Sequence, residues 1–98
     1  MTLLTTHVLD TALGRPAAGI PVVLEGLGGA VTDADGRASL GRIEPGTHRL
    51  TFDVAEYFGE RDAFYPEVTI TFVVAAGEDH YHVPLLLGPF GYTTYRGS

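Results

Sequence analysis

Residues 67–74, EVTITFVV, alternate polar and apolar side chains from Glu67 to Phe72, and only Val73 breaks the alternation. Every second residue from Val68 to Val74 is apolar, so these side chains leave one face of an extended chain. A helix would instead place its apolar residues at a spacing of about 3.6. The stretch therefore predicts a β-strand with one buried face, and no other period competes with it.

The same period of two continues on both sides of this stretch. It predicts about eight short strands separated by turn signals, at residues 3–8, 19–25, 29–32, 37–40, 47–54, 67–74, 80–87 and 92–96. The exception is Val54–Phe58, whose composition predicts one short helix before Gly59. Pro84 falls inside a predicted strand and indicates an edge or a bulge there. The pattern favours an antiparallel β-sandwich that forms a single domain over residues 1–98.

Composition limits the classes of function. The chain has 98 residues and a formal net charge of −6, and a nucleic-acid-binding surface would need the opposite sign. Apolar residues make up 45% of the chain, which is enough for a packed core. Charged residues make up only 18%, below the usual quarter. For so small a domain, this deficit indicates that partner subunits cover part of the surface.

Several residue types are absent from the chain: Cys, Lys, Trp, Asn and Gln. Thiol nucleophiles, disulfides, thiolate metal sites and Schiff-base or P-loop lysines are therefore excluded. Polar chemistry is left to four His, six Arg, the carboxylates, the hydroxyls and the backbone. No run approaches the roughly 20 apolar residues of a membrane span. The N-terminus has no basic segment followed by a long apolar one, so we expect a cytoplasmic protein.

His80-Tyr81-His82 is the first candidate for chemistry. At period two, both imidazoles leave the same face of a strand. This placement suits a metal ion, with His7 as a third ligand, and it equally suits acid–base work near neutral pH. The alternative is a pair of histidines that face solvent, and the spacing alone does not choose among the three.

Two further segments are candidates on weaker grounds. Asp33-Ala34-Asp35-Gly36 begins like a calcium loop, but the later positions of that loop are wrong, so a tight turn is predicted. Arg37 follows the turn and is either a ligand-binding cation or an ordinary surface residue. The tail, residues 91–98, is aromatic and strand-like, which predicts an ordered C-terminus rather than a frayed one.

Together these segments resemble the 5-hydroxyisourate hydrolase family, also called transthyretin-related proteins. The resemblance spans essentially the whole chain. It is carried by residues 6–10 (THVLD), 32–37 (TDADGR), 56–58 (EYF), 64–67 (FYPE), 80–87 (HYHVPLLL) and 95–98 (YRGS). The most specific part is the histidine segment with the terminal YRGS. Transthyretin, the hormone carrier of the same fold, lacks that ending.

The resemblance implies a fold, an assembly and a set of site residues. The fold would be an all-β, transthyretin-like (prealbumin-like) Greek-key sandwich of two four-stranded sheets with one short helix. The assembly would be a homotetramer with active sites at the dimer–dimer interface. The catalytic residues would be His7, Arg37, His82 and Ser98, and the substrate-binding residues of the tail would be Tyr95, Arg96 and Gly97.

The implied reaction is the hydrolytic opening of 5-hydroxyisourate, a purine-derived small molecule, to 2-oxo-4-hydroxy-4-carboxy-5-ureidoimidazoline in urate catabolism. No cofactor and no metal would be required. Arg37 suits a planar, readily anionic substrate, and a histidine beside a cationic Arg stays neutral, as a base must. Which histidine is the base stays open, as does whether the Ser98 hydroxyl or its terminal carboxylate acts.

Three other interpretations compete with this one. The first is a non-catalytic, transthyretin-like binding protein, against which the four catalytic residues argue. The second is a structural or carbohydrate-binding sandwich module, which the segment around Asp33 would allow by itself. The third is a metalloenzyme built on His7, His80 and His82. The chain also departs from typical members by shorter loops near residues 26–29 and 40–47, and by Gly88 where Ser is common.

Overall fold

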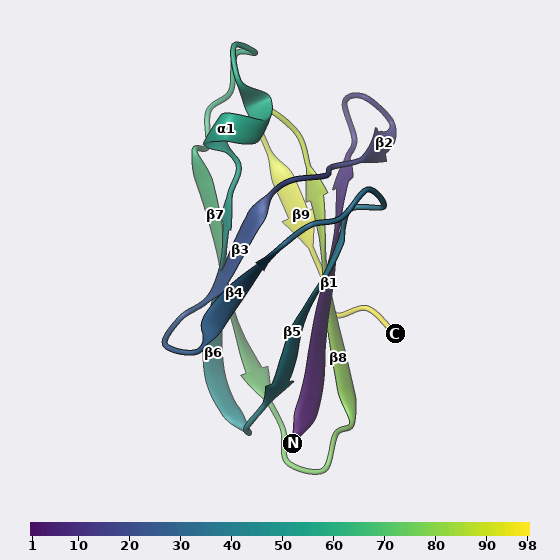
Figure 1. Ribbon diagram of the computed structural model, residues 1–98, viewed down its shortest axis with the longest axis vertical. Coiled ribbons are helices and arrows are strands. Elements are labelled where there is room, and N and C mark those ends of the chain that lie inside the picture. Colours follow the sequence, from purple (N-terminus) through teal and green to yellow (C-terminus); the bar gives the residue numbers. More distant parts are fainter.

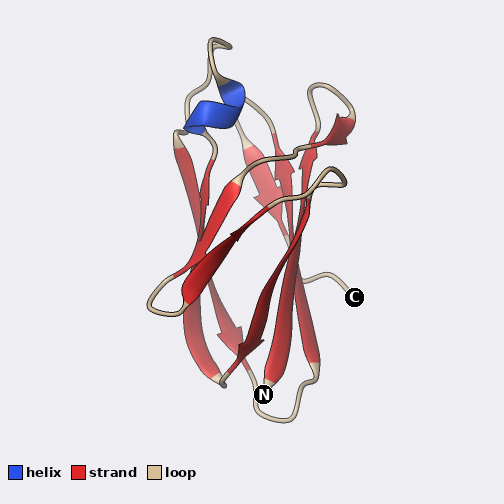
Figure 2. Ribbon diagram, viewed as in Figure 1, coloured by secondary structure: helices blue, strands red, loops and turns tan.

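Two β-sheets face each other in the computed structural model, which describes residues 1–98, and one short helix lies at an end of the sandwich (Figures 1 and 2). The elements in chain order are β1 (Thr2–Asp10), β2 (Arg15–Pro16), β3 (Pro21–Leu24), β4 (Gly28–Val31), β5 (Arg37–Ile43), β6 (Gly46–Asp53), α1 (Ala55–Phe58), β7 (Glu67–Val74), β8 (His80–Leu87) and β9 (Tyr92–Thr94). The sandwich and the helix before Gly59 confirm the prediction from the alternation.

The sheets contain four and five strands. The first has the order β4-β3-β6-β7, and the second has the order β2-β1-β8-β9 with β5 also paired to β1. The expectation of two four-stranded sheets is thus one strand short. The reason is local: β5 pairs β1 up to His7, and the two-residue β2 then pairs the end of β1, at Leu9 and Asp10. β5 and the two-residue β2 therefore share β1 as a partner strand, and a two-residue strand has no period to detect.

One strand pairing differs from the antiparallel expectation. β1 and β8, from opposite ends of the chain, pair in parallel over eight residues, whereas the other six strand pairs are antiparallel. Alternation reports which face is buried but not the direction of the neighbouring strand. This parallel pair sets His80 and His82 beside β1.

Pro84 lies in β8, which runs between β1 and β9, so the strand is not an edge. Gly97 donates its backbone N–H to the His82 carbonyl in an isolated antiparallel bridge. If the pairing continued from this bridge, Pro84 would lie opposite Tyr95 and would have to exchange backbone hydrogen bonds with it. The Pro84 nitrogen has no hydrogen to donate. Pairing with the chain end is accordingly interrupted between Thr94 and Gly97.

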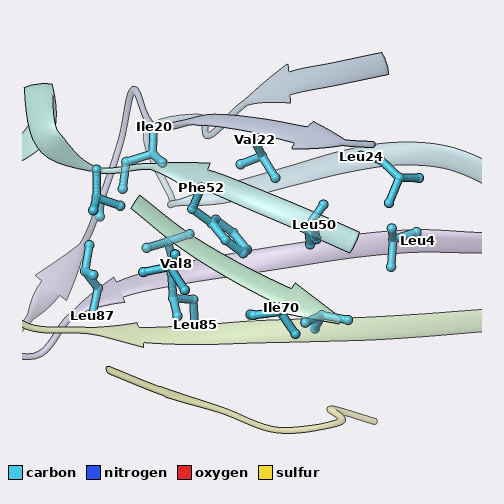
Figure 3. Close-up of a cluster of buried hydrophobic side chains, with 14 of the residues drawn as sticks. Leu4, Val8, Ile20, Val22, Leu24, Leu50, Phe52, Ile70, Leu85 and Leu87 are labelled. Atoms are coloured by element: carbon cyan, nitrogen blue, oxygen red, sulfur yellow. The ribbon is translucent and has the colours of Figure 1, made fainter. Parts of the chain in front are cut away.

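The core lies between the sheets and is built from the inward residues of the alternating strands. Figure 3 shows Leu4 and Val8 of β1 meeting Leu50, Phe52 and Ile70 of the other sheet. Eighteen hydrophobic residues form this cluster. Because every second residue of β1 is used in the core, the residues between them, including Thr5 and His7, are left on the outer face. No helix of the structure is long and apolar enough to cross a membrane.

A buried carboxylate ties the end of β1 to the helical end of the sandwich. Asp10 accepts hydrogen bonds from the Tyr57 hydroxyl at 2.6 Å, from the Arg61 guanidinium at 3.0 Å, and from the backbone N–H groups of Ala12 and Leu13. Burial alone would raise the pKa of the Asp10 carboxyl, but the hydrogen bonds from Tyr57, Leu13 and Arg61 lower it overall. Asp10 is therefore a satisfied anion that holds α1 in place.

Candidate active site

Three adjacent strands, β5, β1 and β8, carry the candidate site on the outer face of the five-stranded sheet. The register places His7 of β1 opposite Arg37 of β5, and Thr5 opposite both Ser39 of β5 and His82 of β8. Residues that are distant in the sequence thus become lateral neighbours on one face. The pairing of strands, rather than any local motif, assembles the site.

The turn before β5 positions both Arg37 and His7. Asp33 Oδ1 accepts the backbone N–H groups of Asp35 and Arg37, and this closes the turn that the sequence predicted. The Asp35 carbonyl then accepts a hydrogen bond from His7 Nε2 at 2.8 Å. Gly36 is needed because its φ is +76° and a Cβ there would lie 2.4 Å from the Val8 carbonyl oxygen.

The hydrogen bond to Asp35 determines the tautomer of His7. A carbonyl oxygen can only accept, so His7 Nε2 carries a hydrogen, and in the neutral ring the lone pair lies on Nδ1. The Arg37 guanidinium makes no hydrogen bond or ion pair within the chain, so its donors are free for a ligand.

His80 and His82 leave the same face of β8, as the spacing predicted, and both contact Thr5 of β1. Thr5 Oγ1 lies 2.7 Å from His80 Nε2 and 2.9 Å from His82 Nδ1. The centroids of the two rings are 6.2 Å apart. His80 is exposed whereas His82 is half-buried, so the two histidines have different environments although they share a partner.

The chain end folds back onto His82. Gly97 donates its N–H to the His82 carbonyl at 2.8 Å, and a Cβ at position 97 would lie only 2.7 Å from Cδ2 of the His82 ring. Only a residue without a side chain fits here. This close approach brings the last residue, Ser98, to the histidines.

A cavity of about 570 Å³ opens between these groups. Its polar lining includes Thr5, Arg37, Ser39, His80, His82 and Ser98. The volume is that of a site for a small molecule. Of the predicted catalytic residues, Arg37, His82 and Ser98 line this cavity together. His7 is not in the lining, although it is the cross-strand neighbour of Arg37.

His82 is held in its neutral form. Burial lowers the pKa of its imidazole below 6.5, and the nearby positive charges of His80, His7 and Arg37 lower it further. A neutral imidazole with a free nitrogen is the form that can accept a proton. His82 Nε2 has no hydrogen-bond partner within the chain, so it is free to do so.

Comparisons with known proteins agree with this geometry. The HIUase/Transthyretin family matches residues 4–97. The chain belongs to this family. It is 45% identical to a 5-hydroxyisourate hydrolase of Deinococcus radiodurans, covering 97% of this chain and 95% of that protein, and 43% identical to one of Mus musculus, covering 97% and 94%.

Solved structures of the HIUase/Transthyretin family have the same fold. Klebsiella pneumoniae 5-hydroxyisourate hydrolase superposes with a TM-score of 0.90 at 40% identity over 100% of both chains. Transthyretin from Sparus aurata superposes with a TM-score of 0.82 at 28% identity over 96% of this chain and 95% of that one. The fold is therefore shared by proteins with different names, and function has to be argued from the site.

Tyr95 and Arg96, predicted as substrate-binding, face a different groove in this family member. They line it with Tyr81, Val83 and Phe72, on the side of the sandwich where β7 and β9 are the edge strands of the two sheets. The Arg96 guanidinium lies 4.2 Å above the centre of the Tyr81 ring and 3.8 Å from the Glu78 carboxylate. Both residues thus anchor the tail outside the histidine cavity.

Sequence reasoning missed Thr5. The residue lies two positions before His7, so period two places it on the same outer face, and this was the available signal. Its hydrogen-bond partners, His80 and His82, lie on β8. No pattern in the sequence predicts that β8 pairs in parallel with β1. The three histidines His7, His80 and His82 do not form a group that could hold a metal ion.

Proposed function

We propose that this chain hydrolyses 5-hydroxyisourate in urate degradation. The observation that carries the proposal is a single cavity in which an unpaired Arg37 guanidinium, the neutral His82 and the terminal Ser98 meet. Relatives of nearly the same length with the name 5-hydroxyisourate hydrolase support it. The product is 2-oxo-4-hydroxy-4-carboxy-5-ureidoimidazoline.

The residues of the cavity suit attack by water on a ring amide. His82 Nε2 removes a proton from water as the water oxygen bonds to the carbonyl carbon. Arg37 donates hydrogen bonds to the oxygen that becomes negative. The carbon–nitrogen bond then breaks, and the leaving nitrogen takes the proton from His82. All reacting groups come from water, the substrate and this chain.

His82 suits the role of base better than His7. Both neutral rings have one nitrogen without a partner in the chain, but His82 lines the cavity whereas His7 does not. His7 is placed instead to hold the turn that carries Arg37, through its hydrogen bond to the Asp35 carbonyl. Ser98, through its hydroxyl or its terminal carboxylate, would hold the substrate or the water.

A coupled assay tests the activity. Urate oxidase generates 5-hydroxyisourate in the cuvette, and its decay is followed with and without this protein. We expect faster decay in proportion to the amount of protein, and no change on adding a strong chelator. A folded protein that binds the compound without hastening its decay would instead be a binding protein like transthyretin.

Two substitutions test the assignment of residues. His82→Ala removes the base and should lower kcat/KM by about 100-fold or more, and Arg37→Ala should cost a similar factor. The matched controls are His48→Ala and Arg49→Ala on β6 of the other sheet, which should keep the activity of the unmodified chain. Near-normal rates in His82→Ala would contradict the assignment.

We also propose that the chain forms a homotetramer, with its active sites where two dimers meet. Both sheets end in an unpaired edge, β7 in one and β9 in the other, and residues of both sides line the Tyr95 groove. Apolar side chains are exposed here: Val73 at 69%, Tyr95 at 55% and Tyr92 at 40%. Open edges with apolar neighbours are suited to pairing with a second copy.

Light scattering on the purified protein tests this assembly. A tetramer would have a mass of about 42 kDa, four times the 10.4 kDa of one chain. A mass near that of one chain at micromolar concentration would contradict it.

A further inference from the structure

The hydroxyl group of Thr5 lies between two imidazoles and has only one hydrogen. Its oxygen is 2.7 Å from His80 Nε2 and 2.9 Å from His82 Nδ1. A threonine hydroxyl donates one hydrogen bond and accepts through its lone pairs. It therefore cannot donate to both histidines, and the proton on one ring constrains the proton on the other.

Two arrangements of the hydrogens fit these contacts: Thr5 donates to His80 Nε2 and accepts from His82 Nδ1–H, or Thr5 donates to His82 Nδ1 and accepts from His80 Nε2–H. In the first arrangement the hydrogen of the neutral His82 ring lies on Nδ1. The proposed role of His82 as a base requires this first arrangement.

This arrangement leaves His82 ready to act as a base. With its hydrogen on Nδ1, the neutral ring has its lone pair on Nε2, which has no partner in the chain. The opposite arrangement, with Thr5 donating to His82, would put the hydrogen on Nε2 and remove the base.

The surroundings favour movement of a proton from His82 to His80. Burial is the largest cause that lowers the pKa of His82, and the positive charge of Arg37 lowers it as well. His80 is exposed to water at the rim of the same cavity. A positive charge is hence better solvated on His80 than on His82.

Building on the proposed hydrolysis, we propose that Thr5 is a positioning residue that sets the tautomer of His82 and relays its proton to His80. When Nε2 of His82 takes a proton from water, Nδ1 gives its own proton to Thr5 Oγ1. Thr5 simultaneously passes its hydroxyl proton to His80 Nε2, so each atom that loses a proton is matched by one that gains it. The reverse shift returns the charge to His82 as Nε2 delivers its proton to the leaving nitrogen.

The kinetic test removes only the hydroxyl. Thr5→Val keeps the branched shape and should lower kcat by about tenfold or more with little change in KM. Thr5→Ser restores a hydroxyl and should recover most of kcat. Thr51→Val, on the exposed face of β6, is the matched control and should behave like the unmodified chain.

A second kinetic arm separates a relay from a packing effect. His80→Gln keeps a polar group near Thr5 but cannot take up a proton. If the two residues form one path, the double variant Thr5→Val/His80→Gln should be no slower than the slower single variant. Multiplied losses in the double variant would show two independent roles and overturn the relay.

A spectroscopic measurement without substrate distinguishes this proposal from the proposed function. Ring ¹⁵N chemical shifts of His82 should report hydrogen on Nδ1 at neutral pH in the unmodified chain and in Thr5→Ser, and loss of that form in Thr5→Val. Hydrogen on Nε2 of His82 in the unmodified chain would overturn the proposal even if the hydrolase assay succeeds. Conversely, the expected tautomer together with an inactive chain would refute the hydrolase function alone.

Discussion

Gly97 is the residue that places the chain end at the cavity. Its backbone pairs with His82, and the missing side chain leaves room for the imidazole ring. Ser98 reaches the cavity only because this approach is so close. The absence of a side chain at position 97 therefore determines where Ser98 lies relative to His82.

Gly97→Ala should displace the tail from His82 and lower kcat/KM by about 10-fold to 100-fold, since a shift near 1 Å is enough for such a loss. Thermal unfolding should change little, because the tail contributes no residue to the core. Gly91→Ala is the matched control, since a Cβ there has no atom within 4 Å. Equal activities of the two variants would refute the role of Gly97.

The protonation state of His82 is a second property of a single residue on which the proposed activity depends. Its pKa is lowered below 6.5, so the base stays neutral down to more acidic pH than an ordinary histidine. Activity that needs the neutral ring is lost as pH falls through this lowered pKa.

We therefore expect the acidic limb of kcat/KM against pH to have its midpoint below pH 6.5. An NMR titration of His82 in the absence of substrate should give the same midpoint, which separates it from any titration of the substrate. A midpoint above 6.5 in the NMR titration would contradict the environment described for this ring.

At the scale of elements, the contact between β1 and α1 depends on one buried carboxylate. Asp10 is completely buried, and its oxygens are satisfied by Tyr57, Arg61 and the turn after β1. A helix of one turn has little stability of its own. Its position is consequently set by this cluster and by the burial of Phe58.

Tyr57→Phe removes one hydrogen bond to a buried charge and should lower the free energy of unfolding by about 1–3 kcal/mol. Tyr65→Phe is the control, because the Tyr65 hydroxyl makes no hydrogen bond in the chain and its ring contacts Phe64 and Tyr92 edge to face. Denaturant titrations of both variants measure the difference. Equal stabilities would show that the Asp10 cluster does not support the helix.

At the scale of the whole molecule, the site lies on a sheet face open to water. The cavity borders the outer face of β1, β5 and β8, and a single chain does not enclose it. A second pair of subunits over this face would exclude water and strengthen the electrostatic contacts of Arg37 and His82 with the substrate.

If the proposed tetramer completes the site, activity per chain should fall on dilution in step with the loss of tetramer. Parallel measurements of mass and of initial rate over a range of protein concentrations check this. Activity that stays constant while the mass falls to that of a single chain would show that one chain suffices.

Patterns along the chain were enough to predict most of the strands, the helix and the types of polar group that are present. Alternation located the long strands, the composition around Val54 located the helix, and the absence of Cys and Lys left His, Arg and hydroxyls as the polar groups. The Asp33 turn and the common face of His80 and His82 were also readable, because they depend only on neighbours along the chain. The resemblance of residues 80–87 and 95–98 to a family supplied the candidate catalytic set.

The spatial arrangement of these strands and site residues depends on tertiary contacts that no local pattern predicts. The parallel pairing of β1 with β8 brings Thr5 between His80 and His82, and the crossing of the Asp33 turn from one sheet to the other brings Arg37 beside His7. The pairing of Gly97 with His82 brings Ser98 to the cavity, whereas Tyr95 and Arg96 line another groove. The physical reason is that periodicity encodes which face of a strand is buried, whereas strand order and direction arise from contacts between residues far apart in the chain.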